Sequence, residues 1–357
     1  MISNNLLLGL NTGELRELML EEGEPAYRGS QLAEWLYIHG TRTFDDMSNL
    51  PTSLQIKLTR KYRIGRSKVA ALQQGNDGSV KLLLELNDGV KIETVGLPYA
   101  DRFSCCLSTQ AGCSIGCIFC ASGQDGLVRS LEPGEIIEQV LTVNEMVEAG
   151  MIHVESRKQR IDHVVLMGMG EPLLNYESTI KAVRLMNSEM GIGARNITVS
   201  TVGIVPGILK LAKEKLQITL AVSLHAPNDK LREKLIPGMT RWSIYEIINA
   251  SREYIQRTGR RVTFEYCMLD KINDSILEAK ELAMILKSLN CHVNLIRYNP
   301  VSSLPFKASP QKQVRSFREI LHNAGIQGTQ RFQRGVDIDA ACGQLRQHME
   351  NANFPQK

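Results

Sequence analysis

From about residue 102 onward, strand patterns and helical patterns alternate along this chain of 357 residues. Six runs rich in apolar and β-branched residues predict strands, namely Phe103–Ser108, His163–Met167, Ile197–Thr201, Ile218–Ser223, Val262–Met268 and His292–Tyr298. Apolar residues at helical spacing lie between them, and a further helix is predicted over Gln311–Ala324. Strands joined by helices run parallel and collect ligands at their carboxyl ends. Six strands are too few for a closed eight-stranded barrel, so an open barrel or a doubly wound sheet remains.

The residues before this region have a different pattern. Apolar residues recur at helical spacing in Gly13–Glu21 and Gly29–His39, whereas Val80–Leu86 and Val90–Val95 flank a turn sequence and predict a β-hairpin. We therefore predict four parts. They are a helical accessory domain over 1–64, a β-hairpin linker over 65–98, a core over 99–345 and a flexible tail over 346–357.

Charge and apolar content limit the possible partners. The net charge of +4 is mild, but basic residues gather in Lys61–Lys68, Arg157–Arg160 and Arg257–Arg261. Each cluster is compatible with a solvated loop, and together they favour a polyanionic partner. Neither a membrane-spanning apolar run nor a secretory leader is evident, so we expect a cytoplasmic protein. In that compartment the 8 cysteines indicate metal binding or catalysis rather than disulfides.

Three cysteines follow the first predicted strand in a CxxxCxxC pattern: Cys113, Cys117 and Cys120. Cysteine thiolates are the usual ligands of iron–sulfur clusters, and three of them leave one iron of a [4Fe–4S] cluster open. A structural zinc site would need a fourth ligand, such as Cys106 or Cys342, and zinc sites favour CxxC pairs. The spacing therefore favours a cluster over zinc.

With Phe119 before its last cysteine, this loop resembles that of the radical S-adenosylmethionine (SAM) superfamily. The resemblance implies an α/β fold, a partial (β/α)6 barrel. It also implies that the open iron chelates SAM, which an electron from the cluster cleaves to methionine and a 5′-deoxyadenosyl radical. Met167–Pro172 resembles the family's GEP segment, which contacts the amino group of SAM.

Polar residues at several predicted strand ends are expected to complete the cofactor site. Each of them alone is also typical of a turn or a helix cap. Because the carboxyl ends of parallel strands share one edge, together they predict a single pocket. The predicted SAM-binding residues are Gly170, Glu171, Ser200, Ser223, Leu224, His225 and Asn299.

A second resemblance gives roles to two cysteines outside the loop, Cys106 and Cys342, and indicates the reaction. The chain is similar over nearly its full length to the RlmN/Cfr family of RNA methyltransferases. The matching segments are Tyr27–Trp35, Phe44–Pro51, Ile92–Val95, Ser108–Cys113, Met167–Pro172, Ser200–Gly203, Ser223–His225, Asn294–Pro300 and Asp337–Leu345.

Membership of that family implies methylation of an aromatic carbon of adenosine, which is not nucleophilic enough for ordinary methyl transfer. Cys342 would take a methyl group from one SAM, and a second SAM would activate it as a radical that adds to the base. Cys106 would then attack the sulfur of Cys342 and release the product, leaving a disulfide. Glu93 aligns with the family's proton acceptor, although Cys106 could take that proton itself. Cys105 precedes Cys106, and strand neighbours face opposite sides, so only one can point inward.

The resemblance also implies the partners. The expected substrates are an adenosine of 23S rRNA at the peptidyl-transferase centre and the adenosine beside the tRNA anticodon. We favour carbon 2 over the Cfr-type carbon 8, because the 13-residue Glu93–Cys106 spacing fits the RlmN type. We expect a monomer that receives electrons from a flavodoxin- or ferredoxin-type donor.

Two other classes of protein stay open from the sequence. One is a radical SAM enzyme acting on a small molecule or on a protein, such as a glycyl-radical activase, which would need neither Cys342 nor the amino-terminal domain. The other is an RNA-binding protein with structural zinc.

Overall fold

The computed structural model describes residues 5–154 and 156–345. One ten-stranded sheet, in the order β1-β2-β3-β4-β7-β8-β9-β10-β11-β12, organises the chain. From β4 onward neighbouring strands run parallel. These strands are β4 (Phe103–Cys106), β7 (His163–Leu166), β8 (Ile197–Thr201), β9 (Thr219–Ser223), β10 (Val262–Met268), β11 (Cys291–Arg297) and β12 (Gln327–Gln330). The predicted parallel α/β fold is confirmed, and the sheet is open, since its order ends at β1 and β12.

β12 is one parallel strand more than the sequence pattern predicted. Its sequence, Gln327-Gly328-Thr329-Gln330, contains no large apolar residue, and its side chains are exposed or half-buried. Apolar periodicity cannot detect such an edge strand, because the strand is held by its pairing with β11 rather than by burial.

The residues predicted as a hairpin linker belong to the main sheet. β1 (Lys68–Gln74), β2 (Val80–Glu85) and β3 (Lys91–Pro98) form an antiparallel meander, and β3 pairs in turn with β4. The register places Val95 opposite Cys106. The meander therefore extends the sheet beside the first strand of the parallel region.

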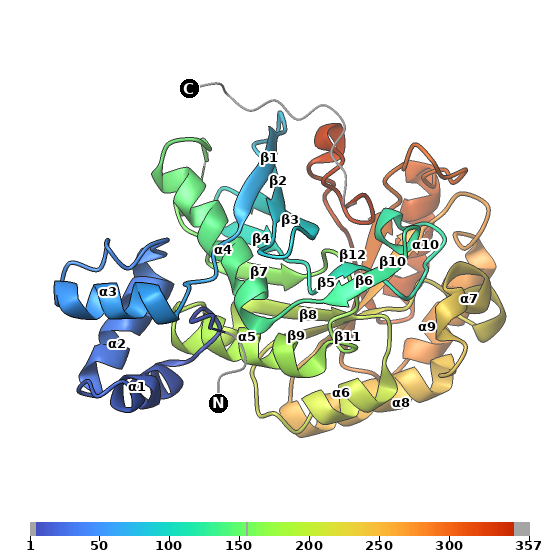
Figure 1. Cartoon of the computed structure of the whole chain (residues 1–357). Coiled ribbons are helices and arrows are strands. Elements are labelled where there is room, and N and C mark those ends of the chain that lie inside the picture. The colour runs from blue at the N-terminus through green and yellow to red at the C-terminus, as the bar shows by residue number, and fades with distance from the viewer. Residues whose placement is uncertain (1–4, 155, 346–357) are drawn as a thin grey trace.

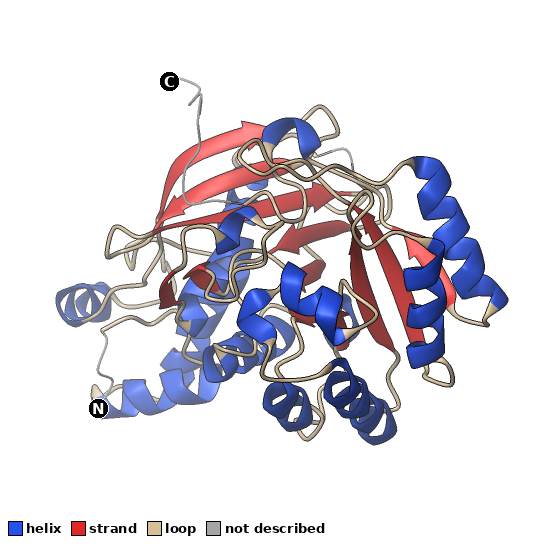
Figure 2. Cartoon of the chain, turned by 90° about the vertical axis from the view of Figure 1, so that its right-hand side faces the viewer, coloured by secondary structure: helices blue, strands red, loops and turns tan. Residues whose placement is uncertain are grey.

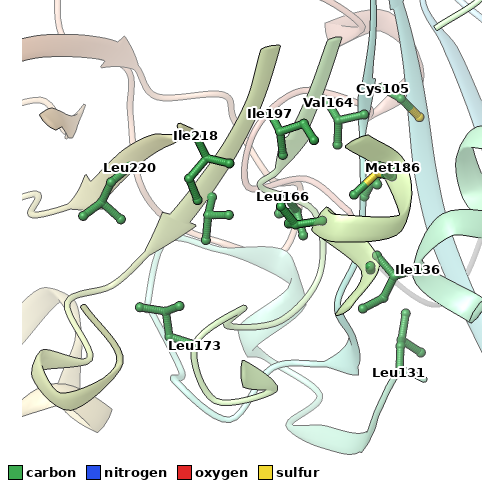
Figure 3. Close-up of a cluster of buried hydrophobic side chains, with 14 of the residues drawn as sticks. Cys105, Leu131, Ile136, Val164, Leu166, Leu173, Met186, Ile197, Ile218 and Leu220 are labelled. Carbon is green, nitrogen blue, oxygen red and sulfur yellow. The ribbon is translucent and has the colours of Figure 1, made fainter. Parts of the chain in front are cut away.

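Helices lie around the outside of the curved sheet (Figures 1 and 2). They are α4 (Pro133–Glu148), α5 (Tyr176–Ser188), α6 (Val205–Leu211), α7 (Asp229–Leu235), α8 (Ile244–Thr258), α9 (Ile276–Leu286) and α10 (Gln311–Asn323). Figure 3 shows the core between the two layers, where Ile136 and Met186 from helices meet Val164 and Ile197 from strands. Cys105 belongs to this core. No helix in the described part of the chain is long and apolar enough to cross a membrane.

The amino-terminal helices pack to one side of the sheet (Figure 1). They are α1 (Thr12–Glu21), α2 (Tyr27–Glu34), the π-helical turn Trp35–His39 and α3 (Thr52–Lys61). A buried ion pair joins the segment that follows them to α4: Arg66 Nε lies 3.5 Å from Glu138 Oε1, with the side chains 3% and 1% exposed. Glu138 also accepts a hydrogen bond from the N–H of Ser67.

This buried pair yields a stability prediction. Replacing Glu138 with Gln removes the charge that compensates Arg66 inside the protein, so the free energy of unfolding should fall by roughly 3 kcal/mol. The control is Glu145→Gln, because Glu145 also pairs with Arg66 but is 35% exposed and should cost much less. Urea unfolding followed by circular dichroism measures both variants. Equal losses in the two would contradict the assignment.

Candidate active site

A small two-stranded sheet brackets the cysteine loop, Cys113–Cys120. Its strands are β5 (Gln110–Gly112) and β6 (Leu127–Ser130). Gly112 has a φ of +77°, and a Cβ on it would lie 2.0 Å from the carbonyl oxygen of Gly126, so only glycine lets the chain close here. The loop also packs on the end of α7, where the N–H of Ile118 donates to the carbonyl of Leu235 at 3.1 Å.

The cysteine loop and the carboxyl ends of the parallel strands enclose a cavity that we call the cluster pocket. All three loop cysteines line it, together with most of the residues predicted to bind SAM. Its polar and sulfur-bearing lining includes Cys113, Cys117, Cys120, Glu171, Ser200, Thr201, Ser223, His225, Glu265, Cys267, Tyr298, Arg331 and Cys342, and Gly170 also lines it. The sheet thus brings these residues to one edge, as parallel strands require.

The donor set of the cluster pocket fits an iron–sulfur cluster. Burial, with repulsion from Cys120 and Cys113, raises the pKa of the Cys117 thiol, and burial raises the pKa of Cys113 to about 11. Iron would displace those protons and offset the repulsion between the thiolates. Among residues 5–154 and 156–345, no three Cys, His, Asp or Glu side chains converge to hold a single metal ion. The three cysteines instead line one cavity.

The turn after β7 is fixed by Gly170 and Glu171. Gly170 has a φ of +97°, and a Cβ on it would lie 2.5 Å from the Cβ of Gln110. The Glu171 carboxylate accepts the N–H groups of Leu173 at 3.0 Å and Val202 at 2.7 Å. Burial raises the pKa of Glu171 to about 7. This carboxyl group therefore both fastens the turn and faces the cluster pocket.

The predicted residues after β8 and β9 separate into two groups. Ser200, Ser223 and His225 line the cluster pocket, and the two serine hydroxyls lie 3.4 Å apart. His225 is neutral, because burial lowers its pKa to about 3, and its Nδ1 accepts the N–H of Cys267 at 2.9 Å. Leu224, in contrast, is buried in the hydrophobic core and does not line either pocket.

A second, adjoining cavity is lined by Cys106 and Cys342, and we call it the thiol pocket. It shares Cys120, Arg331 and Cys342 with the cluster pocket. Its lining includes Leu97, Tyr99, Cys106, Cys120, Met167, Asn299, Arg331, Phe332, Gln333, Arg334 and Cys342. Cys342 therefore faces both cavities.

The two neighbouring cysteines of β4 face opposite sides of the sheet, as predicted. Cys105 packs in the core under the helices, whereas Cys106 lies with Val95 and Leu97 on the inner face. Of these two cysteines, only Cys106 lines the thiol pocket, which it shares with Cys342.

Cys342 lies on a carboxy-terminal loop that is fastened to the cysteine loop. The N–H of Ala121 donates to the carbonyl of Gly343 at 2.7 Å, and the Ser122 hydroxyl donates to the carbonyl of Leu345 at 2.7 Å. Asn299 donates to the carbonyl of Cys342 at 3.0 Å. In this structure Asn299 therefore lies in the thiol pocket, where it holds the main chain at Cys342, rather than in the cluster pocket.

Glu93, the predicted proton acceptor, does not line either pocket. It is buried on β3, two residues before Val95, and forms an ion pair with Lys81 at 3.4 Å. Because Val95 pairs with Cys106, Glu93 lies on the same face of the sheet as Cys106.

Arg331 is a pocket residue that the sequence did not indicate. It follows β12 and lines both pockets, and its Nη1 lies 3.3 Å from Met167 Sδ. The sulfur of Cys342 and the carboxylate of Glu265 raise its pKa. Glu265 is itself buried and accepts a hydrogen bond from Asn294 at 3.0 Å. Because β12 has no apolar signal, nothing in the sequence indicated that Arg331 would face the site.

Comparison with known proteins places this site in a family. The Radical SAM superfamily model matches residues 107–283, and that of the Ribosomal RNA large subunit methyltransferase N-terminal domain matches residues 5–64. A radical SAM methyltransferase from Sphaerobacter thermophilus has a similar structure, with a TM-score of 0.91, 44% identity and coverage of 96% of this chain and 99% of that chain. Fold and site thus define a radical SAM methyltransferase.

Curated relatives show to which family of radical SAM methyltransferases the chain belongs. A probable dual-specificity RNA methyltransferase RlmN from Thermosynechococcus vestitus is 45% identical over 342 residues, covering 96% of this chain and 98% of the relative. One of the same name from Rippkaea orientalis is 44% identical over 346 residues, covering 97% and 98%. The chain belongs to the RlmN family of radical SAM RNA methyltransferases. This membership argues against both the zinc protein and the activase.

The cluster assignment predicts which cysteine substitution removes iron. Cys117→Ala should lose most of the roughly four irons per chain after anaerobic reconstitution, because two thiolates hold a cubane poorly. Cys267→Ala is the matched control, since Cys267 lines the same pocket but lies outside the loop. Iron and sulfide analysis with absorption spectroscopy measures both. Full iron content in Cys117→Ala would contradict the ligand assignment.

Proposed function

We propose that this enzyme methylates carbon 2 of adenosine in 23S rRNA and in tRNA through a methylated Cys342, with Cys106 as the resolving thiol. The observation that carries the proposal is the shared thiol pocket of Cys106 and Cys342, which opens beside the three cysteines of the loop. An enzyme that only generated a radical for another substrate would need neither of these two thiols.

We assign cluster binding and SAM binding to different residues of the cluster pocket. When bound, the cluster and SAM supply a transferable methyl group and a one-electron route to a carbon radical. Cys113, Cys117 and Cys120 would hold the cluster, and the turn of Gly170 and Glu171 would bind SAM in the same pocket. We assign two SAM molecules to each turnover, because one methyl transfer and one radical are needed.

Cys342 lines both cavities, which supports its proposed role as the carrier of the methyl group. Its sulfur would attack the methyl carbon as a nucleophile, and Arg331 places a positive charge near that thiolate. After the methyl carbon has joined the base, Cys106 would attack the sulfur of Cys342. For the balance, the adduct would first return one electron to the cluster and give up the ring proton. As the sulfur–sulfur bond forms and the carbon–sulfur bond breaks, the electron pair would stay on the carbon, which takes up a proton and leaves as the methyl group of the RNA. Glu93, on the same face as Cys106, or Cys106 itself would take the ring proton.

The substrate proposal rests on the relatives and on the amino-terminal domain. Curated relatives are named for dual specificity toward RNA, and residues 5–64 match a domain named for ribosomal RNA methyltransferases. We assign carbon 2 because these relatives carry the RlmN name. We also propose a cytoplasmic monomer that receives electrons from a flavodoxin- or ferredoxin-type protein.

The resolving role of Cys106 predicts a trapped intermediate. Cys106→Ala should accumulate a covalent adduct between Cys342 and RNA, because no thiol remains to release the product. Cys105→Ala is the control, since Cys105 lies on the same strand but faces the core. Denaturing gels and mass spectrometry of nuclease-treated protein detect the adduct. Clean turnover by Cys106→Ala would overturn the role.

The choice of carbon gives a separate prediction. RNA treated with reconstituted enzyme should contain 2-methyladenosine, measured by liquid chromatography and mass spectrometry of nucleosides from 23S rRNA and tRNA. The Cfr-type alternative predicts 8-methyladenosine in the rRNA instead. Detection of 8-methyladenosine alone would overturn the assignment to carbon 2 and leave the radical chemistry in place.

A further inference from the structure

Phe332 combines high solvent exposure with a position in the lining of the thiol pocket. Its side chain is 82% exposed, more than any other large hydrophobic side chain in the described part of the chain. Even so, Phe332 lines the thiol pocket together with Cys106 and Cys342. A flat apolar ring thus stands in solvent at the mouth of the cavity where the methyl group would be transferred.

Both neighbours of Phe332 in the chain make hydrogen bonds. The backbone N–H of Arg331 donates to the carbonyl of Leu295 at 2.9 Å, and the side-chain amide of Gln333 donates to Asn299 Oδ1 at 2.8 Å. Asn299 in turn holds the carbonyl of Cys342. The segment that carries Phe332 is therefore tied by hydrogen bonds to the residue that holds the main chain at Cys342.

A second aromatic ring, that of Tyr99, and the guanidinium group of Arg334 also line the thiol pocket. The guanidinium carbons of Arg102 and Arg334 lie 4.2 Å and 4.6 Å from the ring centroid of Tyr99. Tyr99 and Arg334 line the thiol pocket with Phe332. Aromatic rings interleaved with guanidinium groups are the combination that binds unstacked bases and their phosphates.

We propose that Phe332 stacks on the target adenine as it leaves the RNA stack and enters the thiol pocket. A ring modified on a carbon atom must be unstacked to reach the sulfur of Cys342, and the lost stacking has to be replaced. Phe332 offers the replacement surface, while Arg334 supplies positive charge for the RNA backbone. This inference rests on the proposed RNA methylation and adds a positioning residue to it.

The test compares three variants in single-turnover methylation of an RNA hairpin, using enzyme whose Cys342 has first been methylated and checked by intact mass. Phe332→Leu keeps an apolar side chain but has no ring, and it should lower kcat/KM for RNA roughly 5- to 100-fold. Phe332→Tyr keeps the ring and should stay within about twofold of wild type. Tyr245→Leu is the matched control, because Tyr245 is 75% exposed on α8 and lies outside both pockets.

Wild-type rates from Phe332→Leu would overturn the stacking role alone. A loss that Phe332→Tyr shares would overturn it as well, because the ring would then not be the feature that matters. If the wild-type enzyme itself leaves RNA unmethylated, the proposed function fails and the stacking role fails with it.

Discussion

The site depends on the fastening of the carboxy-terminal loop to the cysteine loop. Two hydrogen bonds, from Ala121 to Gly343 and from Ser122 to Leu345, place Cys342 beside residues more than 200 positions earlier in the chain. Together with the hydrogen bond from Asn299 to the carbonyl of Cys342, they fix the main chain that carries the sulfur of this cysteine. Because backbone and hydroxyl groups make these contacts, they fix position without adding charge to a site that already holds several thiols.

The open sheet explains why so many groups meet in one place. The seven parallel strands of the main sheet, β4 and β7 to β12, present their carboxyl ends to the same edge, and each of them has a pocket residue within it or directly after it. Helices cover only the outer face (Figure 2), so the inner face holds the pockets. Cys105 and Cys106 show the consequence most simply: adjacent residues of one strand serve the core and the site separately.

The sequence predicted the parts of the fold and site that leave an apolar or a spacing signal. The predicted strands, the cysteine loop and the opposite orientation of Cys105 and Cys106 all follow from such signals. β12 did not, because its polar residues are held by edge pairing alone, and Arg331 and Phe332 come directly after it. The surroundings of single side chains also could not be predicted. Asn299 was expected to bind SAM but donates a hydrogen bond to the main chain of Cys342 in the thiol pocket. Leu224 was also expected to bind SAM but is buried in the core.

The pairing of Cys106 with Cys342 is the central claim, and peptide mapping of the enzyme after one turnover tests it most directly. Turnover is run without added thiol, and the protein is alkylated, digested and analysed by mass spectrometry. We predict a disulfide between the Cys106 and Cys342 peptides that forms only when RNA is present. A disulfide from Cys342 to Cys105 or to Cys267 would contradict this pairing. Free thiols on both Cys106 and Cys342 after product release would contradict it as well.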